Sequence, residues 1–102
     1  MELKPGSRWK SAVCESEVVV VRAAKGDVRL ECGGQMMIAM SDPREAGVAP
    51  LPEFSGGTLA GKRYVDSEFD IELLCTKAGK GSLAVNGRAA TVKEAKKLPS
   101  SD

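Results

Sequence analysis

Histidine is absent from this chain of 102 residues. Its absence removes the commonest general base and the commonest metal ligand in proteins. Within the chain, it also excludes a Ser-His-Asp triad or a Cys-His pair for nucleophilic catalysis. Carboxylate pairs can work without histidine, but Asp70 and Glu72 are predicted on a solvent-facing side of a strand, where raised pKa values are not expected. We therefore expect binding rather than catalysis.

The chain also has few aromatic residues and a small net charge. The sequence has one Trp, one Tyr and two Phe, too few for a platform on which nucleic-acid bases stack. Its formal net charge is +1, whereas nucleic-acid binders usually carry a strong basic excess. No apolar run approaches the about 20 residues that cross a bilayer. The first residues show no basic stretch leading into an apolar one. We expect a cytoplasmic protein with no nucleic-acid or membrane partner.

The length and composition predict one small globular domain. A chain of 102 residues has room for a single domain. Apolar residues make up 42% of it and charged residues 28%, which are ordinary globular proportions. We place this domain at residues 1–98, followed by a short tail at 99–102.

The apolar patterning predicts β-strands. Residues 28–32 and 69–75 alternate between apolar and charged side chains, the period of a strand with one buried face. Four consecutive valines at 18–21 suggest a strand covered on both faces. With a further strand at 7–14, the first third is predicted to be a three-stranded meander. Asn86-Gly87 between apolar runs predicts a type I′ hairpin.

A change of composition marks a long loop at residues 41–61. Prolines, glycines and alanines dominate this stretch, and loops of such length are usually functional. It contains Leu51 and Phe54, apolar residues that a fully solvated loop would not favour. We expect these two side chains to fold back onto the core or to contact a partner. The whole pattern predicts a mainly β domain of six to eight short antiparallel strands, a small barrel or sandwich.

The three cysteines admit several interpretations. Cys14, Cys32 and Cys75 are too few for a disulfide framework, and each ends a predicted strand. If these ends meet, three thiolates could bind zinc or another thiophilic metal. However, the chain has no C-x-x-C pair. Cys32 and Cys75 fall on inward faces, where free cysteine packs as a small hydrophobe. Cys14 shares a face with Lys10, which is expected to lower its pKa and make it the most reactive thiol.

Cations near two glycine-rich segments suggest an anion site. Lys62 and Arg63 follow a stretch with the spacing of a phosphate-binding P-loop, but Arg63 replaces the hydroxyl residue that would hold magnesium. Lys77 and Lys80 lie in a second glycine-rich loop. These four residues could bind a small anionic ligand, although solvated lysines are the simpler interpretation.

The sequence thus predicts a small non-catalytic β domain that acts as an interaction or accessory module. We expect it to bind another protein or itself, and to be oligomeric, with no cofactor. The first alternative is a metal or redox protein that uses the three cysteines. The second is a binder of a small anion.

Overall fold

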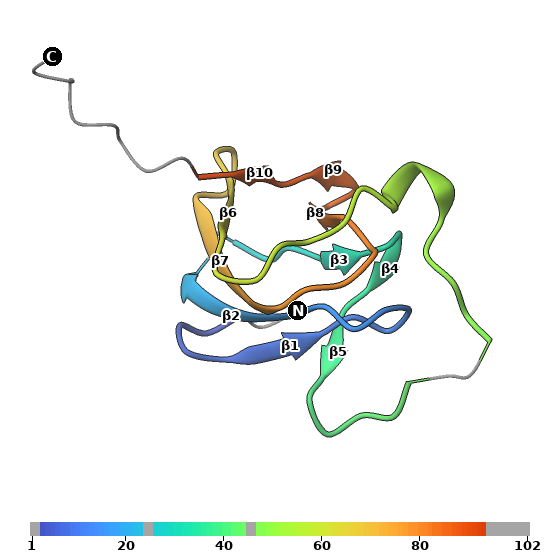
Figure 1. The fold of residues 1–102 in the computed structure, drawn as a ribbon. Helices are drawn as coiled ribbons and strands as arrows, with labels where there is room; N and C mark the ends of the chain where they lie inside the picture. The colour runs from blue at the N-terminus through green and yellow to red at the C-terminus, as the bar shows by residue number, and fades with distance from the viewer. Residues whose placement is uncertain (1–2, 24–25, 45–46, 94–102) are drawn as a thin grey trace, which may run out of the picture.

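The fold consists of two antiparallel β-sheets. The computed structural model describes residues 3–23, 26–44 and 47–93, and no α-helix occurs among them. The larger sheet has six strands and the smaller has four (Figure 1). In spatial order the larger contains β10 (Thr91–Val92), β6 (Arg63–Asp66), β7 (Ile71–Lys77), β2 (Glu17–Arg22), β1 (Arg8–Lys10) and β5 (Ile38–Ala39). The smaller contains β4 (Gln35–Met36), β3 (Leu30–Cys32), β8 (Leu83–Val85) and β9 (Arg88–Ala89). The prediction of a mainly β fold is confirmed, but the described residues form ten strands and not the predicted six to eight.

The chain passes between the two sheets at both pairs of edges. Strand β4 is followed after Met37 by β5, and β9 is followed after Ala90 by β10. The amide of Met37 donates to the Leu30 carbonyl at 2.9 Å, and that of Ala90 donates to the Leu83 carbonyl at 2.9 Å. The ladders of the described residues do not close into a barrel. Whether the sheets pack as a sandwich stays a prediction.

One apolar core is shared by strands of both sheets. Leu30, Leu73 and Val85 are fully covered, and they come from β3, β7 and β8. Residues 28–32 bury the face that their alternation predicted.

The strand predicted over 69–75 begins only at Ile71, and its apolar positions are buried as predicted. Glu72, predicted to face solvent, is instead buried, and its carboxylate pairs with Arg63 and Lys93.

The valine run differs from its prediction, because Val18 and Val20 are buried whereas Val21 is 40% exposed. Strand β2 is therefore buried on one face, whereas the other face is half-buried at Glu17 and Val19 and exposed at Val21.

The predicted three-stranded meander is wrong. Strands β1 and β2 do pair, with Trp9 opposite Val18. The second neighbour of β2 is β7, far along the chain, while β3 pairs with β4 and β8 in the smaller sheet. Alternation reveals which face of a strand is buried, but it does not identify the partner strand.

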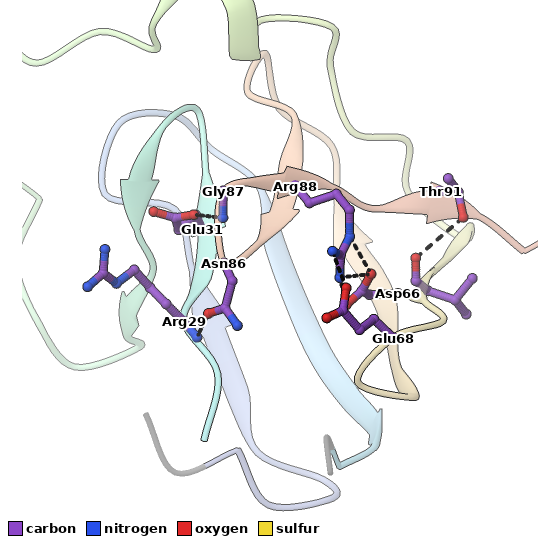
Figure 2. Close-up of polar contacts among 9 residues, drawn as sticks. Arg29, Glu31, Asp66, Glu68, Asn86, Gly87, Arg88 and Thr91 are labelled. Atoms are coloured by element: carbon purple, nitrogen blue, oxygen red, sulfur yellow. Dashed lines mark hydrogen bonds and ion pairs between the residues drawn. The ribbon is translucent and has the colours of Figure 1, made fainter. Parts of the chain in front are cut away.

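The Asn86-Gly87 hairpin is confirmed. Both residues have positive φ angles, 51° and 79°, as a type I′ turn requires. The Asn86 side chain also accepts a hydrogen bond from the Arg29 amide at 2.8 Å, and the Gly87 amide donates to Glu31 at 2.7 Å (Figure 2). The turn is thus fixed against β3 as well as by its own geometry.

An arginine on this hairpin ties the two sheets together. Arg88 of β9 donates to both carboxylate oxygens of Asp66, at the end of β6, with distances of 2.8 Å from Nη2 (Figure 2). Arg88 also pairs with Glu68. Because Asp66 is buried, its charge needs this bidentate partner. The ion pair therefore links the larger sheet to the smaller.

The long loop carries little regular structure in its described part. It holds one short 3-10 helix, η1 (Pro52–Phe54), and an isolated bridge between Thr58 and Gly79. The tail predicted at 99–102 lies outside the described residues.

The alternation in β2 predicts a sharp contrast between two neighbouring valines. Val20→Ala should lower the free energy of unfolding by about 2–3 kcal/mol, because it leaves a cavity in the core. Val21→Ala should change it by less than about 0.5 kcal/mol. Urea denaturation of both variants checks this. Equal losses would mean that the strand is covered on both faces after all.

Candidate functional site

Two of the three cysteines lie side by side. The sulfurs of Cys14 and Cys32 are 3.7 Å apart. Cys14 belongs to the loop between β1 and β2, whereas Cys32 ends β3 in the other sheet. Cys14 is partly exposed and Cys32 is fully buried. The pair thus consists of one thiol that is accessible to solvent and one that is shielded from it.

A buried serine shapes the loop that presents Cys14. The Ser11 hydroxyl accepts hydrogen bonds from the amides of Val13 and Cys14, both at 3.1 Å. The Ser11 amide in turn donates to the Ser16 carbonyl at 2.8 Å. These bonds end β1 at Lys10, short of the strand predicted over 7–14. They also hold the Cys14 backbone in one place.

Hydrogen-bond donors surround the Cys14 sulfur. In its protonated form the thiol donates to the Ser16 hydroxyl oxygen at 3.3 Å. Once the thiol ionises, that hydroxyl can donate to the sulfur instead. Burial acts to raise the pKa of Cys14, but hydrogen bonds from the Ser11 and Ser16 hydroxyls and from the Ser16 and Gly81 backbone outweigh it and lower the pKa to about 7. The predicted direction is therefore right, although the cause is this set of donors and not Lys10.

Two glycines allow the backbone to lie directly against both sulfurs. A Cβ atom at Gly79 would lie 2.3 Å from the Ser16 hydroxyl and 3.0 Å from the Cys14 sulfur. One at Gly81 would lie 3.0 Å from the Cys32 sulfur and 2.9 Å from the Gly33 amide nitrogen. Only a residue without a side chain fits at either position.

Thr58 holds this glycine segment in place. The Thr58 amide donates to the Gly79 carbonyl at 2.9 Å, and the Thr58 carbonyl accepts from the Gly79 amide at 3.2 Å. Its buried hydroxyl donates to the Gly81 carbonyl. The long loop therefore contributes to the site through its backbone bridge, in addition to any contact that its apolar side chains make.

The other two thiols are held in their protonated forms. Burial raises the pKa of Cys32 to about 11, and the neighbouring Cys14 charge adds to the effect. Burial likewise raises the pKa of Cys75, which donates to the Lys77 carbonyl at 3.2 Å. Both belong to the apolar core, in agreement with the prediction from their inward positions. At neutral pH, Cys14 is the thiol most readily ionised.

This arrangement can form and break a disulfide. The thiolate is the reactive form of cysteine in thiol–disulfide exchange. Cys14 provides a thiolate close to neutral pH, and the Cys32 sulfur is near enough to become the second atom of a disulfide. The two sulfurs must approach from 3.7 Å to the about 2.05 Å of a disulfide bond. Partial exposure lets a reagent reach Cys14 first.

The metal prediction finds no assembled ligand set. Among residues 3–23, 26–44 and 47–93, no group of three or more Cys, Asp or Glu side chains is placed to hold a metal ion. Zinc binding by Cys14, Cys32 and Cys75 stays a prediction.

The four predicted anion-binding residues differ in their surroundings. Arg63 pairs with Glu72 at 3.0 Å, and Lys77 lies 4.0 Å from Glu17. Lys62 and Lys80 are exposed. Two of the four thus have a carboxylate nearby. Lys80 lies between Gly79 and Gly81, whose backbone packs against the two sulfurs.

The two apolar residues of the long loop fold back in part. The Leu51 amide donates to the Gly33 carbonyl at 2.9 Å, and its side chain packs so closely on Gly34 that a Cβ there would lie 2.5 Å from it. The Phe54 carbonyl accepts from the Ser82 amide at 2.7 Å, and its side chain is half-buried. Leu51 nevertheless remains 41% exposed.

Sequence reasoning missed the residues that support the thiols. Ser11, Ser16, Gly79 and Gly81 were not singled out as site residues. The only available signal is that serines lie on both sides of Cys14, and that the second glycine-rich loop follows Cys75 directly. Neither pattern is specific, because serine and glycine are common in loops.

Comparisons with known proteins give no family for this chain. No protein-family model matches it, and no curated protein or solved structure is significantly similar to it. Separately, none of the helical structure in the described residues is long and apolar enough to span a membrane.

The donors around Cys14 predict its reactivity. As pH rises through about 7, Cys14 ionises, so its alkylation by iodoacetamide should rise with a midpoint near that value. Cys32 and Cys75 should react far more slowly in the folded protein. Peptide mapping by mass spectrometry after timed labelling measures each site.

A serine variant tests the cause of the lowered pKa. Ser16→Ala removes one hydroxyl donor, so the midpoint for Cys14 should move upward. Ser67→Ala, an exposed serine in the turn before β7, is the matched control and should leave it unchanged. A midpoint of about 8.5 in the unaltered protein, the pKa of free cysteine, would contradict the assigned environment.

Proposed function

We propose that this protein is a thiol–disulfide redox module in which Cys14 and Cys32 form a reversible disulfide. The observation that supports it best is the distance of 3.7 Å between their sulfurs. This choice takes up the redox alternative raised from the sequence. It replaces the interaction module as the first interpretation.

The two thiols suit different steps of such a reaction. Cys14, with its pKa lowered to about 7, is ionised enough to attack an oxidised partner. Cys32 is buried and protonated, so it remains in reserve until a mixed disulfide forms on Cys14. Its thiolate then displaces the bound group. An accessible nucleophile beside a buried resolving thiol is the arrangement that such exchange requires.

The surroundings of Cys14 support this role over simple core packing. A cysteine that only fills space in an apolar core has its pKa raised by burial. At Cys14, hydroxyl and backbone donors reverse this effect. Those donors stabilise the thiolate, which is the reactive form of cysteine. A cysteine that only filled space in the core would have no need of such donors.

A cytoplasmic location belongs to the same proposal. Free thiols persist in reducing compartments, where protein disulfides are usually transient and catalytic or redox-sensing. We also infer that the two sheets pack as a sandwich, since strands from both bury one common core. In this arrangement the thiol pair bridges the two sheets.

Oxidation provides the direct test. Diamide treatment of the full chain should produce one intramolecular disulfide between Cys14 and Cys32, seen as the loss of two hydrogens by intact mass and located by peptide mapping. Cys75→Ser should retain this product, and Cys14→Ser should lose it. An unoxidised Cys75→Ser protein, or a disulfide that involves Cys75 in the unaltered chain, would refute the proposal.

The disulfide should also stabilise the fold. The cysteines lie 18 positions apart in the sequence, and closing a loop of this size stabilises a protein by about 3 kcal/mol. Urea unfolding of the oxidised form should therefore give a higher free energy of unfolding than that of the reduced form. A lower value would mean that bringing the sulfurs together distorts the fold.

A second candidate function is protein association, the interpretation preferred from the sequence. It is favoured by exposed apolar side chains: Met36 is 50% exposed, Leu51 41% and Val48 39%. Met36 and Val48 line an open hollow of about 270 Å³ together with Val13 and Ile38. A soluble chain exposes such groups at a cost unless a partner covers them.

Sedimentation velocity over a range of concentrations tests this second candidate. Self-association that Met36→Lys weakens would support it. A reduced protein that remains monomeric at high concentration, and that retains no co-purified protein, would argue against it. Zinc binding by the three cysteines predicts stoichiometric metal in protein purified without chelator.

A further inference from the structure

The segment that lies against the thiol pair fits closely but is flexible by composition. Gly79 and Gly81 bring backbone directly against the sulfurs of Cys14 and Cys32. Glycine has the widest range of backbone conformations of any residue, so a stretch with two glycines around Lys80 does not hold one shape by itself. Its contacts with the sulfurs therefore depend on a part of the chain that fixes it from outside.

Thr58 of the long loop holds both glycines. Its amide and carbonyl pair with the carbonyl and amide of Gly79, and its hydroxyl donates to the carbonyl of Gly81. Thr58 is only 1% exposed, and Gly81 is buried as well. Hydrogen bonds are electrostatically stronger in such surroundings than in water. One residue thus fixes the backbone on each side of Lys80.

The peptide unit between Gly81 and Ser82 is held at both of its polar ends. Its carbonyl accepts from the Thr58 hydroxyl, and its amide donates to the Phe54 carbonyl at 2.7 Å. Because a peptide unit is planar, these two bonds together fix its orientation. The Gly81 backbone also donates to the Cys14 sulfur. The long loop therefore determines where this donor lies.

Only the hydroxyl of Thr58 makes its hold on Gly81 depend on the side chain. The pairing with Gly79 uses backbone groups and would survive a change of side chain. A valine at position 58 has nearly the same shape but leaves the Gly81 carbonyl without its hydroxyl donor. A buried carbonyl that loses its partner is disfavoured, so the peptide unit would shift to find another.

We propose that Thr58 is a positioning residue for the thiol pair, and that its hydroxyl keeps the Gly81 backbone in hydrogen-bond contact with the Cys14 sulfur. This inference rests on the proposed redox function and adds a residue that acts on Cys14 through the glycine segment. The long loop thereby supports the reactive thiol.

The pH profile of Cys14 alkylation tests this role. In Thr58→Val the midpoint for iodoacetamide should move from about 7 toward the about 8.5 of free cysteine, because the Gly81 donor is displaced. The smaller thiolate fraction should lower the rate at neutral pH by about two- to fivefold. At about pH 10, where Cys14 is ionised in both proteins, the variant should no longer be the slower one.

Three further variants assign the effect to the hydroxyl. Thr58→Ser keeps it and should have the midpoint of the unaltered protein, whereas Thr58→Ala removes it and should move the midpoint upward as Thr58→Val does. Thr91→Val removes a hydroxyl that also donates to a backbone carbonyl, that of Val65 at 3.4 Å (Figure 2). Thr91 lies on β10, which β6 and β7 separate from β2, so this control should leave the midpoint unchanged.

A loosened fold would give a different result. If Thr58→Val acted only by destabilising the protein, the buried thiol of Cys75 would be alkylated faster and Cys14 would not be slowed. The positioning role predicts slower labelling of Cys14 at neutral pH. A Cys14 midpoint that stays near that of the unaltered protein in both Thr58→Val and Thr58→Ala would overturn the inference.

Diamide oxidation separates this inference from the proposed function. As the two sulfurs join, diamide takes up the two hydrogens that the thiols lose. Thr58→Val should form the Cys14–Cys32 disulfide more slowly than the unaltered protein at neutral pH. Equal rates would mean that the role of Thr58 is wrong while the redox function stands. If the unaltered protein forms no such disulfide, the redox function fails, and the alkylation midpoints still decide the role of Thr58.

Discussion

The close approach of a glycine backbone to two sulfurs is the constraint on which the candidate site depends. Gly79 and Gly81 leave no room for a Cβ atom beside Cys14 and Cys32. Because the backbone can lie so near, the Gly81 backbone and the Ser16 hydroxyl both stabilise the Cys14 thiolate. A side chain at either glycine would push the segment away, and the Cys14 sulfur would lose the Gly81 hydrogen bond that helps to lower its pKa.

The path of the chain between the sheets brings the two cysteines together. Cys14 precedes β2 of the larger sheet, and Cys32 ends β3 of the smaller one. The chain connects the two sheets covalently at Met37 and at Ala90. The ion pair between Arg88 and Asp66 is a third link between them. A contact between sheets can be kept at 3.7 Å only if such links fix their relative position.

The two sulfurs differ because one fold gives them different surroundings. Cys32 lies in the apolar core, where charge is disfavoured and its pKa is raised to about 11. Cys14 lies a few ångströms away at the surface of the same core, among donors that favour its charge. The proposed redox cycle uses this difference directly. The apolar residues around Met36 and Val48 form a separate surface, which the second candidate function would use.

The sequence by itself determined the buried apolar positions of β3 and β7, the Asn86-Gly87 turn and the mainly β class, because each follows from neighbouring residues. The inward positions of Cys32 and Cys75 and the lowered pKa of Cys14 could also be predicted, although the cause of that lowering was not. Only the tertiary structure decided that Val18 lies opposite Cys75, that β3 leaves the meander, and that Glu72 is buried between Arg63 and Lys93. It likewise decided that Cys14 meets Cys32 beneath two glycines. Such contacts join residues far apart in the chain, and local patterns of polarity do not specify which distant segments pair.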